Sequence, residues 1–187
     1  MHKQPLYKKI LFSEKEVNTK IDEMAAAIAT SYDSSSTVFV SLLNGAQPFT
    51  AKLMSAIWRY DPYFHPNVQS MIVSRYGPNR EPGETRVVTD LPPSYRDLTG
   101  KHIVLLDDLV DGGGTLEFAA DHLFSYGAEK VDKVVLIKKQ KQSTGTEVAM
   151  FGFETPDTWL TGMGMDDERV AAEGNRWAGW IAVASDE

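Results

Sequence analysis

The sequence predicts a single α/β domain in which helices flank a central, mostly parallel sheet. Apolar runs of strand length alternate with segments of helical periodicity, and this alternation is typical of parallel sheets. The most informative stretch is residues 101–139, where a strand, a glycine loop, a helix and a second strand follow one another. Sheets of this kind place their functional sites at the carboxyl ends of the strands, so we expect the chemistry there.

Composition excludes several classes of protein. The 187 residues suit one domain, with 42% hydrophobic and 24% charged residues and no internal repeat. The absence of cysteine rules out a disulfide framework, a thiolate metal site and a cysteine nucleophile. A net charge of −7 disfavours a nucleic-acid partner. No apolar run has the length of a membrane span or a signal peptide, so we expect a cytoplasmic protein without a membrane partner.

Four elements are expected in the first part of the chain. Residues 13–32 begin with a Ser–x–x–Glu capping box and carry apolar residues at helical spacing. Residues 37–43 are β-branched and apolar, which indicates a buried strand. A helix over 49–60 and a strand over 70–76 follow, and that helix carries Trp58 and Tyr60 as candidates for an interface between subunits.

The second part of the chain continues the alternation. Residues 77–100 are rich in Pro and Gly, which predicts a loop that contains a short strand near 85–89. Further elements are expected as a strand at 103–108, a helix at 115–127 that Gly127 ends, and strands at 131–139, 148–155 and 180–184.

The segment LLDDLVDGGGTL carries the clearest chemical signal. Asp107 and Asp108 stand where a buried strand ends, Asp111 opens a three-glycine turn, and Thr115 lies in the first turn of the next helix. Backbone N–H groups of such a turn suit a phosphate, and carboxylates suit sugar hydroxyls or a metal, so a sugar phosphate fits both. The alternative is an ordinary β–α turn with capping aspartates. A Walker A loop is excluded because its lysine is missing, and Glu117 replaces the third glycine of a dinucleotide fingerprint.

This segment resembles the phosphoribosyl-diphosphate motif of the type I phosphoribosyltransferases. The resemblance extends to the hypoxanthine-guanine phosphoribosyltransferases over roughly residues 8–184. The matching segments are ILFSEKEVNTKIDEMAAAIA, SLLNGAQPF, VSRYG, VVLIKK and FGFETPDTWLTGMGMDD. The resemblance implies one phosphoribosyltransferase domain, with a core at about 33–147 and a small hood from about 1–15 and 148–187. It implies a reaction of a purine base with 5-phosphoribosyl 1-diphosphate, Mg²⁺ as cofactor, and a homodimer or homotetramer.

The resemblance also assigns roles around the sugar and the base. It implies that Asp107 and Asp108 hold the ribose hydroxyls. It implies a phosphate site of Asp111, Gly112, Gly113, Gly114 and Thr115, with Asp111 also a catalytic general base near the purine N7. Lys138 would donate to the purine 6-oxygen, which selects a 6-oxo over a 6-amino base. Taken without the family, the alternative for Lys138 is a solvent-facing lysine at a strand end.

Three residues of the C-terminal part complete the implied base and metal sites. Trp159 would stack on the base, although a tryptophan that caps the core is the alternative. The Leu160 backbone would contact the base edge. The carboxylates implied for Mg²⁺ are Asp166, Asp107 and Asp108. We expect the neighbouring Asp167 to be a solvated carboxylate.

The residues implied near the diphosphate are Leu43, Asn44, Gly45, Arg75, Tyr76 and Arg176, with Arg169 as a competitor of Arg176. Three residues of the implied phosphate and diphosphate sites depart from the family. Gly112 replaces a Thr and loses a hydroxyl donor, and Asn44 replaces a Lys or Arg and loses a positive charge. Arg75 replaces a Ser and adds a charge. The candidates to replace the lost charge are Arg75, Arg80 and Arg86. The family also implies a cis peptide between Leu43 and Asn44.

Two other functions stay open on the sequence. One is a phosphoribosyltransferase for a different base such as xanthine, because pocket residues distinguish these enzymes poorly. The other is a catalytically weak nucleotide-sensing regulator on the same fold, which Asn44 and Gly112 favour. Water would be excluded from the activated sugar by the loop at 77–90.

Overall fold

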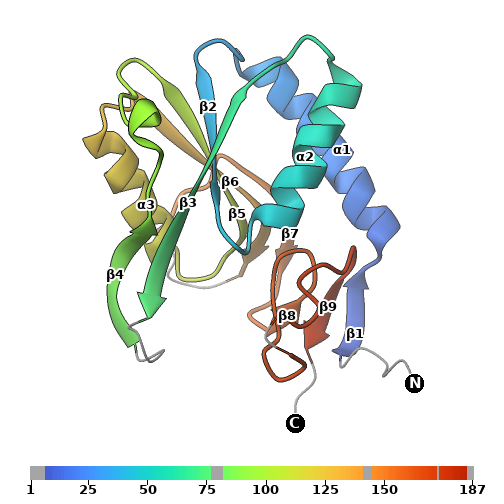
Figure 1. Ribbon diagram of the computed structural model, residues 1–187. Helices are drawn as coiled ribbons and strands as arrows, with labels where there is room; N and C mark the ends of the chain where they lie inside the picture. The colour runs from blue at the N-terminus through green and yellow to red at the C-terminus, as the bar shows by residue number, and fades with distance from the viewer. Residues whose placement is uncertain (1–6, 77–81, 141–144, 172, 185–187) are drawn as a thin grey trace.

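The computed structural model describes residues 7–76, 82–140, 145–171 and 173–184 (Figure 1). The helices and strands in chain order are β1 (Tyr7–Phe12), α1 (Glu14–Ser31), β2 (Thr37–Leu42), α2 (Gln47–Tyr60), β3 (Asn67–Tyr76), β4 (Pro82–Thr89), a 3₁₀ turn (Pro93–Tyr95), β5 (His102–Val110), α3 (Gly114–Ser125), β6 (Lys130–Lys139), β7 (Met150–Thr155), β8 (Leu160–Thr161) and β9 (Ile181–Ala184). None of the described helices is long and apolar enough to cross a membrane.

A six-stranded sheet forms the centre of the molecule, with strand order β4-β3-β2-β5-β6-β7. Neighbouring strands in the series β3-β2-β5-β6-β7 pair in parallel, whereas the edge strand β4 pairs antiparallel with β3. Helices α1 and α2 cover one face and α3 covers the other (Figure 1). The expected α/β fold with a mostly parallel sheet is thereby confirmed, and the carboxyl ends of β2, β5 and β6 meet at one edge.

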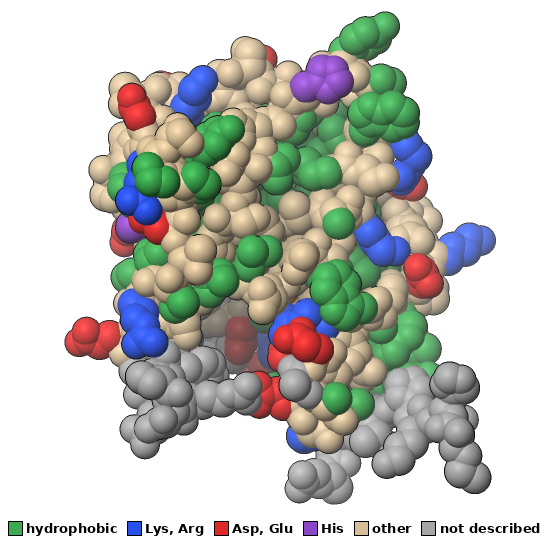
Figure 2. Space-filling model, in the orientation of Figure 1, with side chains coloured by type: hydrophobic (Ala, Val, Ile, Leu, Met, Phe, Trp, Pro, Cys, Tyr) green, Lys and Arg blue, Asp and Glu red, His purple; other side chains and the backbone are tan. Residues whose placement is uncertain are grey.

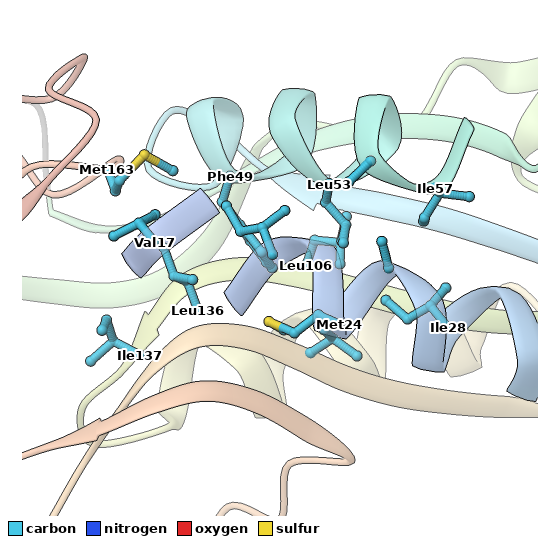
Figure 3. Close-up of a cluster of buried hydrophobic side chains, with 14 of the residues drawn as sticks. Val17, Met24, Ile28, Phe49, Leu53, Ile57, Leu106, Leu136, Ile137 and Met163 are labelled. Carbon is cyan, nitrogen blue, oxygen red and sulfur yellow. The ribbon is translucent and has the colours of Figure 1, made fainter. Parts of the chain in front are cut away.

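The larger hydrophobic cluster joins α1 and α2 to the sheet. Figure 3 shows Phe49 and Leu53 of α2 in this cluster with Val17 and Met24 of α1. Met163, from the segment after β8, belongs to the same buried cluster. The C-terminal segment is therefore packed into the main core, which fixes it relative to the strand ends of the large sheet.

A second, three-stranded sheet forms the hood, with order β1-β9-β8 and antiparallel pairing. We did not expect strands at β1 or β8, because β1 is half exposed and β8 has only two residues. We expected residues 148–155 in the hood, but β7 forms the edge of the large sheet beside β6. Its parallel pairing with β6 is a non-local contact that no local pattern predicts.

Several element bounds differ from expectation. Helix α2 begins at Gln47 rather than 49, because Pro48 in the first turn is compatible with a helix start. Strand β3 begins at Asn67, and β4 covers 82–89 where we expected a short strand within a loop. Gly127 follows the end of α3 with a φ of +87°, as expected of a glycine that ends a helix.

Candidate active site

The ends of the parallel strands open into a hollow between the β3–β4 pair and the hood. Figure 2 shows this hollow with acidic side chains inside it. A pocket of about 190 Å³ lies here, and its charged lining residues are Arg75, Asp107 and Asp111. The remaining lining residues are Leu109, Val110, Gly112, Gly113, Thr115 and Leu116. The structure thus brings the LLDDLVDGGGTL motif together around one cavity.

The glycine loop between β5 and α3 forms one wall of this pocket. Gly113 has a φ of +73°, a conformation that favours glycine, and its carbonyl accepts the Glu117 N–H at 2.9 Å. A Cβ on Gly113 would collide with the hydroxyl of Thr146, and one on Gly114 would collide with the Arg75 guanidinium. The first N–H groups of α3 have no partner within the helix, so this loop offers donors to an anion.

Asp107 and Asp108 sit side by side at the end of β5. Asp107 Oδ1 accepts the Asp108 N–H at 3.0 Å, and Asp108 Oδ1 accepts the Leu109 N–H at 2.7 Å. Burial, and then the charge of Asp108, raises the pKa of Asp107 well above its usual range. Burial raises the pKa of Asp108 to about 6, against hydrogen bonds and the charge of Arg176, which lower it. Such a pair suits hydroxyls or a cation, either of which would stabilise its charge.

The loop between β2 and α2 contacts this carboxylate pair. The Leu43–Asn44 peptide is cis, as the resemblance implied. Gly45 lies so close to Asp108 that an added Cβ would be 2.6 Å from Asp108 Oδ2. A Cβ on Gly164 of the hood would collide with the Gly45 carbonyl oxygen. Glycines at both positions therefore let the loop, the acidic pair and the hood meet.

The two lysines at the end of β6 have different surroundings. Lys139 is buried, and its Nζ lies 3.9 Å from Asp111 Oδ1 and 3.6 Å from Asp157 Oδ1. Lys138 is half-buried, with its Nζ 3.9 Å from Glu154 Oε1 and 5.0 Å from the centre of the Phe151 ring. Adjacent residues of a strand point to opposite faces, so only one of the two can reach Asp111. The structure brings Lys139 to Asp111, and not Lys138.

The hood contributes an exposed aromatic ring beside a buried backbone. Trp159 is 65% exposed, so it does not cap the core, whereas the following Leu160 is buried in β8. Asp157 precedes them and contacts Lys139. Lys139, Asp111 and Asp157 therefore lie close together, and Trp159 follows two residues after Asp157.

Arg176 organises the hood near Asp166. Its side chain is 10% exposed, its Nη2 lies 2.8 Å from Asp166 Oδ2, and its Nη1 donates to the Gly164 carbonyl at 2.6 Å. Its Nε donates to Glu173. With these bonds Arg176 holds Asp166 and Gly164 in place, and its assignment to the diphosphate stays a prediction.

Our expectation for Asp167 is wrong. Its side chain is 3% exposed and accepts Arg169 Nε at 2.8 Å and Nη2 at 2.8 Å. This two-point pair with Arg169 lowers the pKa of Asp167. Arg169 is thereby bound to Asp167, while which of Arg169 and Arg176 faces the diphosphate stays a prediction.

Of the remaining predicted residues, Arg75 and Tyr76 are among the described residues and Arg80 is not. The Arg75 guanidinium lies against Gly114, at the glycine loop. Tyr76 ends β3, and Arg80 lies outside the described residues. Sequence reasoning missed Lys139, Thr146 and Gly164. The pair of adjacent lysines was the available signal for Lys139, because strand alternation requires that one of them faces inward.

Fold and site together define a phosphoribosyltransferase. Residues 9–168 match the family described as phosphoribosyl transferase domain, and the chain belongs to this family. The chain is 32% identical over 161 residues to the hypoxanthine-guanine phosphoribosyltransferase of Bacillus subtilis, with 84% of each chain covered. It is 33% identical over 161 residues to the enzyme of the same name from Aquifex aeolicus, covering 84% of this chain and 86% of that one.

Solved structures agree with these relatives. The hypoxanthine phosphoribosyltransferase from Trypanosoma cruzi, in complex with the product IMP, superimposes with a TM-score of 0.81 at 25% identity. The match covers 99% of this chain and 98% of that chain. The family resemblance inferred from the sequence is therefore confirmed.

Proposed function

We propose that this chain joins a 6-oxopurine, hypoxanthine or guanine, to 5-phosphoribosyl 1-diphosphate and releases pyrophosphate. The observation that carries the proposal is the placement of buried Lys139 near Asp111, which lines the glycine-loop pocket. A lysine has only donors, so it recognises a 6-oxo group. The names of the relatives from Bacillus subtilis and Aquifex aeolicus support the same substrate class.

Each group of residues in the site has a role that its chemistry suits. The glycine loop and Thr115 bind the 5-phosphate, and Asp107 and Asp108 accept hydrogen bonds from the ribose hydroxyls. Trp159 stacks on the base while Lys139, in the role that the resemblance gave to Lys138, donates to its 6-oxygen. Asp111 takes the N7 proton as the glycosidic bond forms. Catalysis consists mainly of positioning and charge stabilisation.

The carboxylates fit the Mg²⁺ that the family implies, provided that the substrate supplies ligands as well. Among the described residues no three His, Cys, Asp or Glu side chains form a metal cluster. Mg²⁺ usually takes one or two carboxylates together with waters and substrate phosphates. The residues that would hold it are Asp107, Asp108 and Asp166. The ion would neutralise charge on the leaving diphosphate.

Base preference tests the function directly. We expect kcat/KM for hypoxanthine or guanine to exceed that for adenine by about 10- to 100-fold, because an ammonium faces a donor in adenine and loses one charge-assisted hydrogen bond. The measurement is steady-state turnover with hypoxanthine, guanine, xanthine and adenine. Equal activity with adenine would contradict the role of the lysine, and a preference for xanthine would support the alternative base. No turnover with any base would indicate the regulator.

Asn44→Lys is expected to strengthen pyrophosphate inhibition. Two unit charges about 4 Å apart interact by about 4 kcal/mol at an effective dielectric near 20, before desolvation is subtracted. If about a third of this interaction energy remains after desolvation, pyrophosphate binding becomes roughly 10-fold tighter. Backbone hydrogen bonds close the turn: the Ala46 N–H donates to the Leu42 carbonyl at 3.0 Å and the Gln47 N–H to the Asn44 carbonyl at 3.2 Å. These bonds do not involve the Asn44 side chain, which can therefore be replaced.

The control for this variant is Asn44→Gln, which changes length without charge. Inhibition constants for pyrophosphate are compared at matched Mg²⁺ in the three proteins. Unchanged inhibition in Asn44→Lys would show that the lost charge is replaced elsewhere or that Asn44 serves the turn itself.

A further inference from the structure

We infer that Arg75 binds the 5-phosphate of the sugar substrate, and not its diphosphate as the family alignment suggested. The inference rests on the proposed function, and it names a phosphate ligand that the glycine-loop motif does not contain. Its basis is the placement of the Arg75 guanidinium against Gly114, where α3 begins.

The position of Arg75 is set by β3. This strand ends at Tyr76, so Arg75 is its penultimate residue. The side chain is exposed to the hollow and lines the pocket of about 190 Å³ together with Asp111, Gly112 and Thr115. Its guanidinium therefore faces the same cavity as the N–H donors of the loop.

Gly114 makes room for this arginine. A Cβ at position 114 would collide with Arg75 Nη2, so any other residue there would push the guanidinium away from the helix start. Position 114 is the variable residue of the family motif. The glycine at 114 and the arginine at 75 are thus compatible as a pair, one supplying space and the other a charge.

The electrostatics of the pocket call for such a charge. The charged side chains that line it are two carboxylates, Asp107 and Asp111, and Arg75 is the one basic residue among its described lining. Glu117, in the first turn of α3, is paired with Lys133 at 2.6 Å. A phosphate dianion at this loop would be repelled by the carboxylates. A guanidinium offsets that repulsion and can bind phosphate with two parallel hydrogen bonds.

The chemistry also explains why Gly112 is tolerated. The family threonine at this position would donate a hydroxyl to the phosphate, and the glycine cannot. Arg75 can replace that neutral donor with a charged one, and charged hydrogen bonds are about twice as strong as neutral ones. The arginine at position 75 thus compensates for the hydroxyl that the glycine at position 112 has lost.

The test compares Arg75→Gln with Arg59→Gln. Arg59 lies in the last turn of α2, where its Nη2 is 2.7 Å from Asp22 Oδ1 and away from the residues that line the pocket, so both variants remove one arginine charge and only one of them removes it from the pocket. Affinities for ribose 5-phosphate and for inorganic pyrophosphate are measured by calorimetry at fixed Mg²⁺. We expect Arg75→Gln to weaken ribose 5-phosphate by about 10- to 100-fold and pyrophosphate by less than about 2-fold. Arg59→Gln should leave both within about 2-fold.

Three results would overturn the inference. They are an unchanged affinity for ribose 5-phosphate in Arg75→Gln, a selective loss of pyrophosphate binding in that variant, and an equal loss of ribose 5-phosphate binding in Arg59→Gln. Retained pyrophosphate binding shows that the variant is folded. Arg75→Lys, which keeps the charge without the two-point geometry, should lie between wild type and Arg75→Gln. If the wild type binds ribose 5-phosphate through Arg75 but turns over no purine, the inference stands and the proposed function fails.

Discussion

Asp111→Asn is expected to lower kcat by about 100-fold or more, because general acid–base groups contribute roughly 10²- to 10⁴-fold. Asp111 begins the glycine loop with 45% of its side chain exposed, and its Oδ1 lies 3.9 Å from Lys139 Nζ. An oxygen at this place can take a proton from a base held by the lysine. The amide keeps the shape of the side chain and removes its basicity. Steady-state kinetics with hypoxanthine and saturating sugar diphosphate give the measurement.

Asp108→Asn is the matched control for this prediction. Asp108 is also a carboxylate of the same motif, but it faces the Gly45 loop and accepts the Leu109 N–H. Its loss should act mainly on KM for the sugar diphosphate, because it is proposed to hold hydroxyls. An unchanged kcat in Asp111→Asn would exclude this residue from proton transfer. Equal effects of both variants on kcat alone would contradict the division of roles.

Lys139→Gln is expected to lower kcat/KM for hypoxanthine by about 10- to 100-fold, the value of one charge-assisted hydrogen bond. The wild-type Nζ lies beyond hydrogen-bond distance from both Asp111 and Asp157, at 3.9 and 3.6 Å. Its protons can therefore be donated to a base placed between these groups. Glutamine keeps a donor without the charge, and the discrimination against adenine should shrink.

Lys138→Gln provides the control, since it removes the same charge one residue away. Lys138 lies over Phe151 and near Glu154, so its loss should change kcat/KM by less than about 2-fold. Thermal unfolding of both variants separates base recognition from stability, because Lys139 is buried and lies near two carboxylates, so its replacement is expected to lower stability as well. A larger kinetic effect for Lys138→Gln would return the base-contacting role to the residue that the sequence alone suggested.

Local sequence patterns determined many of the helices, strands and turns of this protein. The capping box of α1 is present as expected, with Ser13 and Glu16 bonded reciprocally. The apolar run before Asp107 forms a buried strand, and the three glycines form the turn into α3. These features depend on residues close in the chain, so hydrophobic periodicity and backbone preference are enough to predict them. The family resemblance then supplied the fold, which the comparisons confirmed.

Side-chain direction was decided only by tertiary structure. Lys138 and Lys139 have the same chemistry, and the pairing of β6 with β5 and β7 determines which of them reaches Asp111. Asp167 is polar and follows a turn, yet its pair with Arg169 buries it. Arg75 faces the glycine loop because β3 ends opposite α3. For the two lysines, a one-residue change of register would exchange their surroundings, and that register depends on contacts between residues far apart in the sequence.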